Sequence, residues 1–308
     1  MTLYGVIDIG SNTIRLMVYR IENDELYPVL NNKFSAGLAG YVTSRGKLSK
    51  DGIAKVIEVL SELRTVTDQI SLEEMYSFAT ASLRNISNTE EVLVAIQKET
   101  GFQIRVLSGE EEAFFDYYGA IQSATMDSSL LVDVGGGSTE LVSIQHWNAT
   151  KGVSIPVGSL NLYTRFVDGI LPSRSEVRRI QEEVDKQLQD IKFSVPQIPT
   201  MCAVGGTARA ALKLFNALNG NSKNVSYTSE FYLDYLSQMV MGPKKITGSI
   251  LKSSPDRIHT LTPGIAVLQR IANTFGVQNI VTSPYGVREG FLYRRLQQEG
   301  VITAPLRT

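Results

Sequence analysis

Two glycine-rich turns lie far apart in this chain, and each follows an apolar stretch with an aspartate near its end. The first turn, residues 10–13, follows Asp8, and the second, residues 135–139, follows Asp133. Glycine lets the backbone approach a ligand closely, and consecutive peptide N–H groups in such a turn bind anions. Together the two turns predict a phosphate chain gripped between two related domains, although either turn alone would also fit an ordinary β-hairpin. Additional hydroxyl donors come from Ser11, Thr13, Ser138 and Thr139.

Carboxylates beside these turns point to a hard cation. Asp8 and Asp133 can each hold such a cation through an oxygen atom or through its bound waters. Glu140 lies two residues after Ser138, where its charge would repel a phosphate unless a cation lies between them. Asp133 and Glu140 therefore indicate Mg²⁺, with Mn²⁺ as the second choice.

Three consecutive glutamates, Glu110, Glu111 and Glu112, begin a predicted helix. Their simplest role is to favour the helix dipole, because carboxylates stabilise a helix N-terminus. Successive helical residues point about 100° apart, so the three side chains cannot all face one way. One that faced a cleft between the domains could act as a general base toward water.

Other residues could contact phosphate from the ends of strands. Arg84 comes shortly after the apolar segment 76–79, where its guanidinium could bind two phosphate oxygens or pair with a carboxylate at the surface. The turn at Gly206 and Thr207 could direct a helix N-terminus toward a phosphate or nucleotide, or serve only as a tight turn. A last set of basic residues could follow a longer polyanion or lie on the solvated surface: Lys213, Lys244, Lys245, Lys252 and Arg257.

Length and composition bound the remaining choices. The chain has 308 residues, enough for two domains, and a net charge of −1, which gives no general attraction to nucleic acid or anionic membranes. Its single cysteine, Cys202, excludes an intrachain disulfide and fits a cytoplasmic location. We find no signal peptide and no apolar run long enough to span a membrane, and we expect a homodimer only as the commonest oligomeric form.

The pattern of apolar residues predicts two similar halves, each with the order βββαβαβα and a mixed sheet covered by helices. We expect domains at 1–124 and 125–308, with the last helix, 286–298, packing back toward the first domain. Residues 36–48 and 219–228 are predicted to be irregular. In the first half, strands are predicted at 3–8, 14–20, 26–34, 74–79 and 103–107, and helices at 50–68, 88–100 and 110–124. In the second half, strands are predicted at 129–134, 140–145, 152–157, 200–204 and 278–282. Helices are predicted at 158–192 and 206–218, further helices follow through about 276, and the last helix is predicted at 286–298.

Over nearly its whole length the chain resembles the exopolyphosphatase / guanosine pentaphosphate phosphohydrolase family of the actin-like superfamily. The resemblance rests on six segments in order, at residues 7–16, 79–84, 108–113, 133–140, 205–207 and 285–290. It implies two actin-like (ribonuclease H-like) domains, each with a mixed five-stranded sheet and helices, and an active site in the cleft between them. Because the extra helical domains of some members do not follow residue 308, a short polyanion channel is expected.

The resemblance also implies roles for individual residues. Glu112 matches the catalytic base. Its neighbour Glu111 is to be tested as well, because three consecutive glutamates leave open which of them aligns with the base of the family's motif. Arg84 matches the clamp on the terminal phosphate, and Asp133 and Glu140, with Asp8, match the magnesium ligands. The implied phosphate-binding residues are Ser11, Asn12, Thr13, Gly135, Gly136, Gly137, Ser138, Thr139, Gly206 and Thr207.

These expectations describe a Mg²⁺-dependent hydrolase that releases terminal phosphate from inorganic polyphosphate. Guanosine pentaphosphate is the alternative substrate, because both compounds are phosphoanhydride chains. A nucleotide-binding regulatory protein without hydrolysis is the alternative from another class, and a small-molecule kinase is a third.

Overall fold

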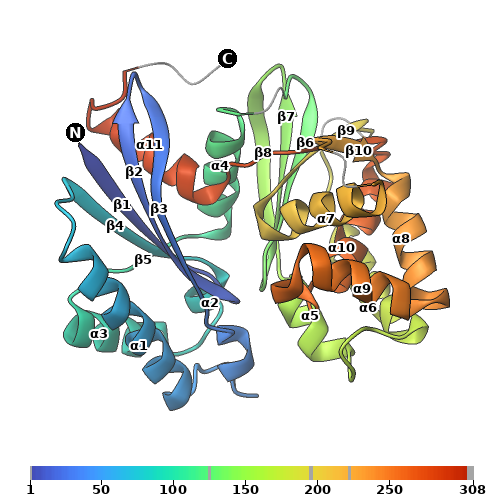
Figure 1. Ribbon diagram of the computed structural model, residues 1–308, viewed down its shortest axis with the longest axis horizontal. Helices are drawn as coiled ribbons and strands as arrows, with labels where there is room; N and C mark the ends of the chain where they lie inside the picture. Colours follow the sequence, from blue (N-terminus) through green and yellow to red (C-terminus); the bar gives the residue numbers. More distant parts are fainter. Residues whose placement is uncertain (1, 124–125, 194–196, 221–222, 304–308) are drawn as a thin grey trace. The chain divides into compact units, whose positions relative to one another are not determined.

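The computed structural model describes residues 2–123, 126–193, 197–220 and 223–303. The chain divides into two compact units (Figure 1). The first contains the chain up to Glu112 and the segment that begins at Phe291, and the second is Ala113–Gly290. The domains expected from the sequence, 1–124 and 125–308, stay a prediction.

The first unit is built on a five-stranded mixed sheet with the order β3-β2-β1-β4-β5. The first three strands are antiparallel neighbours, whereas β4 and β5 continue the sheet in parallel with β1. The strands are β1 (Leu3–Ile9), β2 (Thr13–Glu22), β3 (Glu25–Ser35), β4 (Glu74–Ala79) and β5 (Arg105–Val106).

Helices cover both faces of this sheet (Figure 1). On one face lie α1 (Lys50–Thr67) and α3 (Thr89–Thr100), whose apolar stripes join the strands in one core. Ser49 caps α1 by accepting a hydrogen bond from the Gly52 N–H at 3.2 Å, which confirms the predicted start of that helix. On the other face, the part of α11 (Val287–Gln298) that begins at Phe291 packs on β4, with the Phe291 and Phe78 rings 4.8 Å apart. Short helices occur at η1 (Leu38–Tyr41) and α2 (Ala81–Arg84).

The second unit repeats this strand arrangement and extends it by one strand. Its sheet has the order β10-β11-β9-β6-β7-β8, so the expected count of five was one too low. The added strand, β10 (Ser226–Thr228), pairs antiparallel with β11 inside a segment predicted to be irregular. Its Tyr227 is buried in an aromatic cluster with Phe215 and Phe231, which fixes this short polar strand at the edge. The other strands are β6 (Ser129–Val134), β7 (Thr139–Gln145), β8 (Asn148–Ile155), β9 (Thr200–Val204) and β11 (Asn279–Thr282).

Two separate layers of apolar side chains lie on the faces of the second sheet. On one face α4 (Gly109–Ala120) packs through Ala113 and Tyr117 against Cys202 and Val142. The opposite face holds the larger core, which is shared with the remaining helices. These are α5 (Ser159–Phe166), α6 (Arg174–Leu188), α7 (Gly205–Leu218), α8 (Glu230–Met241), α9 (Pro243–Ser253) and α10 (Leu261–Phe275), with a short turn at η2 (Pro255–Arg257).

The predicted helical stretch 158–192 is divided into α5 and α6. Pro172 lies between them, and the residue before a proline is biased away from helical angles. A new helix then begins at Arg174, after the N-cap Ser173, whose N–H donates to Glu176 at 2.6 Å in a capping box. Within the described part of the chain, no helix is both long enough and apolar enough to cross a membrane.

Candidate functional site

A buried ion pair joins two of the predicted catalytic residues of the first unit. Arg84 ends the short helix after β4, and Glu112 lies in the first turn of α4. Arg84 Nη1 donates to Glu112 Oε2 at 2.7 Å and to the Leu107 carbonyl at 3.0 Å. Only 18% of the Arg84 side chain and 10% of the Glu112 side chain are exposed. The carboxylate is therefore held in one orientation and its charge is compensated where water is scarce.

The other two glutamates of the triplet occupy different environments. Glu111 accepts from the Ser108 N–H at 2.8 Å and pairs with Arg105, while its own N–H donates to Ser108 Oγ at 3.1 Å. Burial alone would raise the pKa of Glu111, but the hydrogen bonds from Ser108 and Arg105 outweigh it and lower that pKa. Glu110 is exposed. Glu111 thus caps the helix, and Glu112 is the member of the triplet that contacts Arg84.

The glycine turn of the first unit is anchored through its carbonyl groups. Gly10 N–H donates to the Thr13 carbonyl at 2.9 Å, which closes the turn between β1 and β2. The Asn12 carbonyl accepts from the N–H groups of Ala36 and Gly37, each at 3.0 Å. The loop 36–41 therefore holds one side of the turn, and Ser11 beneath it is buried.

The glycine turn of the second unit is built in the same way. Gly135 N–H donates to the Ser138 carbonyl at 3.0 Å. The Gly136 carbonyl accepts from the N–H groups of Leu160 and Asn161 at 3.0 Å, and Asn161 Nδ2 donates to the Gly137 carbonyl at 2.9 Å. The start of α5 thus holds this turn as the loop 36–41 holds the first.

A hydroxyl group also braces the strand before each turn. Ser82 Oγ donates to the Ile9 carbonyl at 2.5 Å, and Thr207 Oγ1 donates to the Val134 carbonyl at 2.7 Å. Thr139 is buried as well, and its hydroxyl donates to the Val157 carbonyl at 2.5 Å. Thr207 and Thr139 thus hold backbone carbonyls, and a contact between these hydroxyls and phosphate stays a prediction.

Asp133 and Glu140 lie opposite each other on neighbouring strands of the second unit. Glu140 is buried, and its Oε1 accepts from Ser138 Oγ and Ser154 Oγ, both at 2.7 Å. Asp8 lies on β1 of the first unit, in register with Arg15 of β2. Among the described residues, no three His, Cys, Asp or Glu side chains gather closely enough to hold a metal alone.

Two arginines that the sequence did not single out as site residues surround the Gly205-Gly206 turn at the start of α7. A Cβ atom on Gly206 would lie 2.0 Å from the Arg257 guanidinium, and one on Gly205 would lie 2.0 Å from Asp133 Oδ1. Burial lowers the pKa of Arg257, against the opposing effect of Asp256 and Asp133. Burial likewise lowers the pKa of Arg209, which donates to the Pro284 carbonyl at 3.2 Å.

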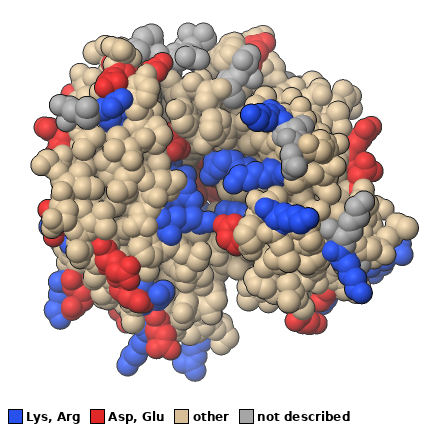
Figure 2. Space-filling model, viewed as in Figure 1, with Lys and Arg blue, Asp and Glu red and all other residues tan. Residues whose placement is uncertain are grey.

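Arg257 was among the basic residues that the sequence offered for a longer polyanion, and tertiary packing brings it to this turn. The surface interpretation was wrong for Arg257, whose guanidinium packs on Gly206. Lys213, Lys244 and Lys252 are exposed, and the side chain of Lys245 lies outside the described part. Figure 2 shows basic side chains gathered over α7 and α9 of the second unit.

A family profile matches this arrangement of motifs over residues 17–299 and is described as the Ppx/GppA phosphatase family. The chain belongs to the Ppx/GppA phosphatase family. Membership makes it a hydrolase of phosphoanhydride bonds, as the sequence motifs predicted. Its two α/β units accordingly have the actin-like ATPase fold of that family.

Relatives in the Ppx/GppA phosphatase family carry two kinds of name. The chain is 26% identical to "Exopolyphosphatase 1" of Mycobacterium tuberculosis over 97% of its own length and 90% of the relative's. It is also 26% identical to "Guanosine-5'-triphosphate,3'-diphosphate pyrophosphatase" of Aeromonas hydrophila, over 94% of its own length and 59% of the relative's. The second relative is therefore much longer than this chain.

Solved structures of the Ppx/GppA phosphatase family have the same fold. The Aquifex aeolicus family member has a TM-score of 0.79 and 26% identity, with 97% of this chain and 98% of that chain covered. An exopolyphosphatase from Cytophaga hutchinsonii has a TM-score of 0.85 at 22% identity, with 96% and 98% covered.

Proposed function

We propose that this phosphatase is a Mg²⁺-dependent exopolyphosphatase, which releases terminal orthophosphate from inorganic polyphosphate by attack of water. The observation that carries the proposal is the buried contact of 2.7 Å between Arg84 and Glu112. A hydrolase needs a base fixed in one orientation and a cation for the transferring phosphoryl group, and this pair would supply both.

In this proposal Glu112 takes a proton from water. The water oxygen forms a bond to the terminal phosphorus, and the bond from that phosphorus to the bridging oxygen breaks. Arg84 holds the base through Nη1, and its planar guanidinium suits the oxygens of a phosphate. The Leu107 carbonyl fixes the position of Arg84, so the guanidinium does not need to be reoriented for the reaction.

Peptide N–H groups of each glycine turn would bind phosphate oxygens. Several turn carbonyls already accept hydrogen bonds from the loop 36–41 or from the start of α5. The edge of each turn that carries N–H groups is consequently the side that suits an anion. Arg257 and Arg209 add positive charge beside the second turn, where Asp133 would otherwise repel a polyanion.

The carboxylates of the second unit fit a magnesium ion. Mg²⁺ is commonly held by one or two carboxylates, with waters and substrate phosphates completing its shell, so a cluster of three is not required. Asp133 and Glu140 would supply that pair, Asp8 is the further candidate, and Mn²⁺ would suit the same oxygen ligands. When bound, the ion would neutralise charge on the phosphoryl oxygens.

Polyphosphate is the preferred substrate because the relative that matches this chain in length is named an exopolyphosphatase. Guanosine pentaphosphate is the alternative, supported by the name of the longer relative. A nucleotide-binding regulatory protein without hydrolysis is the alternative of another class. The single buried thiol agrees with the cytoplasm as the compartment in which the reaction would occur.

The test is phosphate release with Mg²⁺, without metal and with Mn²⁺, from short and long polyphosphate, guanosine pentaphosphate and ATP. We expect polyphosphate to be hydrolysed, and Glu112→Gln to lose about 10²–10⁴ in rate. Glu110→Gln is the matched control on the same helical turn, because that side chain is exposed.

Each result decides between the proposed functions. Release confined to guanosine pentaphosphate would move the protein to the alternative substrate. Tight nucleotide binding with no phosphate release would support the regulatory alternative. Full activity of Glu112→Gln would remove Glu112 as the base.

A further inference from the structure

A small polar cavity lies at one end of the second sheet, within the second unit. It encloses about 200 Å³, several times the ~30 Å³ share of one water molecule. Its lining includes Ser128, Ser143, Gln145 and His146 from β6, β7 and the adjoining turns, and the segment 197–199 before β9. Because β6 spans roughly 17 Å from this end to the second glycine turn, the cavity is separate from that turn.

Two polar atoms of the lining residues are buried without a hydrogen-bond partner. Ser143 is 1% exposed, and its Oγ makes no hydrogen bond within the described part of the chain. Gln145 Nε2 is likewise buried, and no described residue bonds to it. Buried polar groups in proteins nearly always have a partner. The cavity beside these two atoms has room for the molecule that would supply one.

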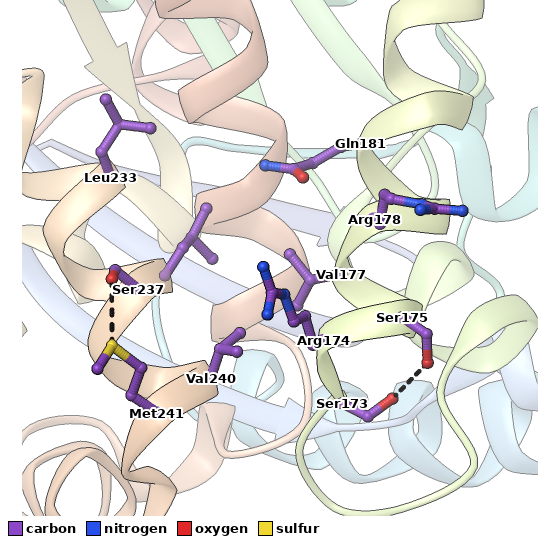
Figure 3. A pocket seen from close by; sticks show the side chains of 11 residues that line it. Ser173, Arg174, Ser175, Val177, Arg178, Gln181, Leu233, Ser237, Val240 and Met241 are labelled. Carbon is purple, nitrogen blue, oxygen red and sulfur yellow. Dashed lines mark hydrogen bonds between the residues drawn. The ribbon is translucent and has the colours of Figure 1, made fainter.

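A larger groove between α6 and α8 differs from this cavity in its polar groups (Figure 3). It encloses about 940 Å³, and the hydroxyl groups that line it have partners. Ser173 Oγ and Ser175 Oγ lie 3.2 Å apart, and Ser237 Oγ lies 3.8 Å from Met241 Sδ. The small cavity is therefore distinguished by its unpaired polar atoms rather than by its size.

Hydrogen-bond donors and a positive charge near the two buried atoms suit an anion. Lys151 lies opposite Ser143 on β8, and paired side chains of neighbouring strands have Cβ atoms about 5 Å apart. Its ammonium group donates to the Lys192 carbonyl at 3.0 Å and carries two further N–H groups. Asp127 brings a negative charge nearby, where its Oδ1 lies 3.8 Å from Nδ1 of His146 and both side chains are largely exposed. A ligand with oxygen acceptors therefore matches the hydroxyl, amide and ammonium donors.

The turn between β7 and β8 holds His146 beside the cavity. His146 and Trp147 have φ angles of +48° and +65°, as a two-residue hairpin turn requires, although Asn and Gly are the usual residues there. Such angles are costly for bulky side chains and cluster where a site needs them. The Trp147 N–H donates to the Asp127 carbonyl at 2.9 Å, and the Trp147 carbonyl accepts from Tyr117 Oη at 2.6 Å. These bonds fix the turn, and they place the one tryptophan of the chain next to a residue of the cavity.

We propose that this cavity binds a small oxyanion, for which orthophosphate is the first candidate. Ser143 Oγ and Gln145 Nε2 donate to its oxygens, and Lys151 balances its charge. The choice of orthophosphate over a carboxylate rests on the proposed function, which releases orthophosphate. The site itself does not rest on that function, because none of these residues belongs to the proposed catalytic site.

The single tryptophan gives a direct measurement, because Trp147 adjoins the cavity residue His146. Inorganic phosphate and acetate are titrated into the full chain while Trp147 fluorescence is recorded, with chloride as the control for ionic strength. We expect a saturable change with phosphate. Saturation with acetate alone would keep the oxyanion site and assign it to carboxylates. The absence of a saturable change with either anion, or an equal change with chloride, overturns the proposal.

Substitution of the two donors tests the location of the ligand. Ser143→Ala and Gln145→Leu should each weaken phosphate binding about tenfold or more, because a hydrogen bond to a charged group is lost. Ser129→Ala is the matched control: Ser129 is also 1% exposed and its Oγ lacks a partner among the described residues, but it does not line the cavity. Ser129 lies opposite Ile144, on the face of the sheet that α4 covers. Equal Kd values for Ser143→Ala and Ser129→Ala would contradict the proposal.

The contribution of charge is measured with Lys151→Gln. This variant should raise the Kd for phosphate about two- to fivefold, as expected for a partly solvated charge. Lys98→Gln on α3 is the control, because that side chain is 79% exposed in the first unit. Equal Kd values for the two variants would remove Lys151 from the site.

A further variant separates this cavity from the proposed catalytic site, which would also bind phosphate. Arg84→Ala alters the proposed clamp on the terminal phosphate, and it should keep the response of Trp147 with an unchanged Kd. A response that is lost in Arg84→Ala and kept in Ser143→Ala would place the ligand at the catalytic site and overturn the proposal. Because the measurement is binding, an inactive wild type would refute the proposed function and leave this result intact.

Discussion

Three consecutive glutamates have three different surroundings in this protein. Glu110 is exposed, Glu111 caps α4 through Ser108, and Glu112 contacts Arg84 in a buried pair. The sequence alone left open whether Glu111 or Glu112 aligns with the catalytic base of the family. Their partners differ, because Glu111 is bound to the Ser108 N–H and Glu112 is bound to Arg84, and the role of Glu112 as the base stays a proposal.

The capping role of Glu111 predicts a change in stability with pH. Its pKa is lower in the folded protein than in the unfolded chain, so the ionised carboxylate stabilises the fold above its unfolded-state pKa. That contribution is lost as the pH falls through the folded-state value. Glu111→Gln should cost about 0.5–1 kcal/mol of unfolding free energy at pH 7, at the low end for a cap because the side chain is 37% exposed.

Denaturant unfolding at pH 7 and pH 3.5 measures this effect. The difference between wild type and Glu111→Gln should shrink at the lower pH, while phosphatase activity at pH 7 stays within a few-fold of wild type. A variant that is as stable as wild type at pH 7 but inactive would reverse the roles of Glu111 and Glu112.

The glycine turn at the start of α7 packs against two charged side chains, those of Asp133 and Arg257. Gly205 has a φ of +76°, and any Cβ there would overlap the Asp133 carboxylate. Gly206 faces the guanidinium of Arg257, which is the far end of a flexible side chain. The two glycines therefore tolerate substitution differently.

We expect Gly206→Ala to fold with nearly normal stability and to displace Arg257, which should raise KM for polyphosphate more than it lowers kcat. Gly205→Ala should lose at least about 1 kcal/mol of stability, because a left-handed backbone conformation is strained for alanine. Gly248→Ala on α9 is the control, since no atom beyond its chain neighbours and its own helix backbone lies within 4 Å of its Cβ position. Equal kinetic constants for Gly206→Ala and wild type would remove Arg257 from substrate binding.

Most elements could be predicted because their signals are local. The helix predicted at 50–68 is α1, and strands such as β4 and β9 have the predicted limits. The short polar strand β10 was missed because its pairing with β11 and the burial of Tyr227 depend on contacts distant in sequence. The break before α6 had a local signal, Pro172 with the capping box, that the helical pattern on either side obscured.

The candidate site was predicted in parts. Motif residues such as Arg84 and Glu112 could be named from the sequence, and the structure describes the contact between them. The hydrogen bonds of Thr139 and Thr207 could not be predicted, because the direction of a hydroxyl depends on which carbonyl the fold places beside it. Arg209 and Arg257 were not identified as site residues for the same reason.

At the scale of the whole molecule, the two units share the construction of their turns down to individual hydrogen bonds. A side-chain hydroxyl after the parallel neighbouring strand, Ser82 or Thr207, donates to the last carbonyl before the turn, at Ile9 or Val134. The N–H group of the first glycine then donates across the turn to the carbonyl three residues later. Such repetition is what a duplicated ancestral domain would retain.

Cys202, the one thiol of the chain, is buried between β9 and α4, where burial raises its pKa to about 12. A thiol reagent acts on the thiolate, so this side chain can react only when the second unit opens. The thiol is thus a built-in reporter of unfolding kinetics. Labelling in buffer should be at least about 10³-fold slower than for a free cysteine, and should accelerate with sub-denaturing urea. Labelling at the rate of a free thiol would mean that the second unit opens far more readily than its packing implies.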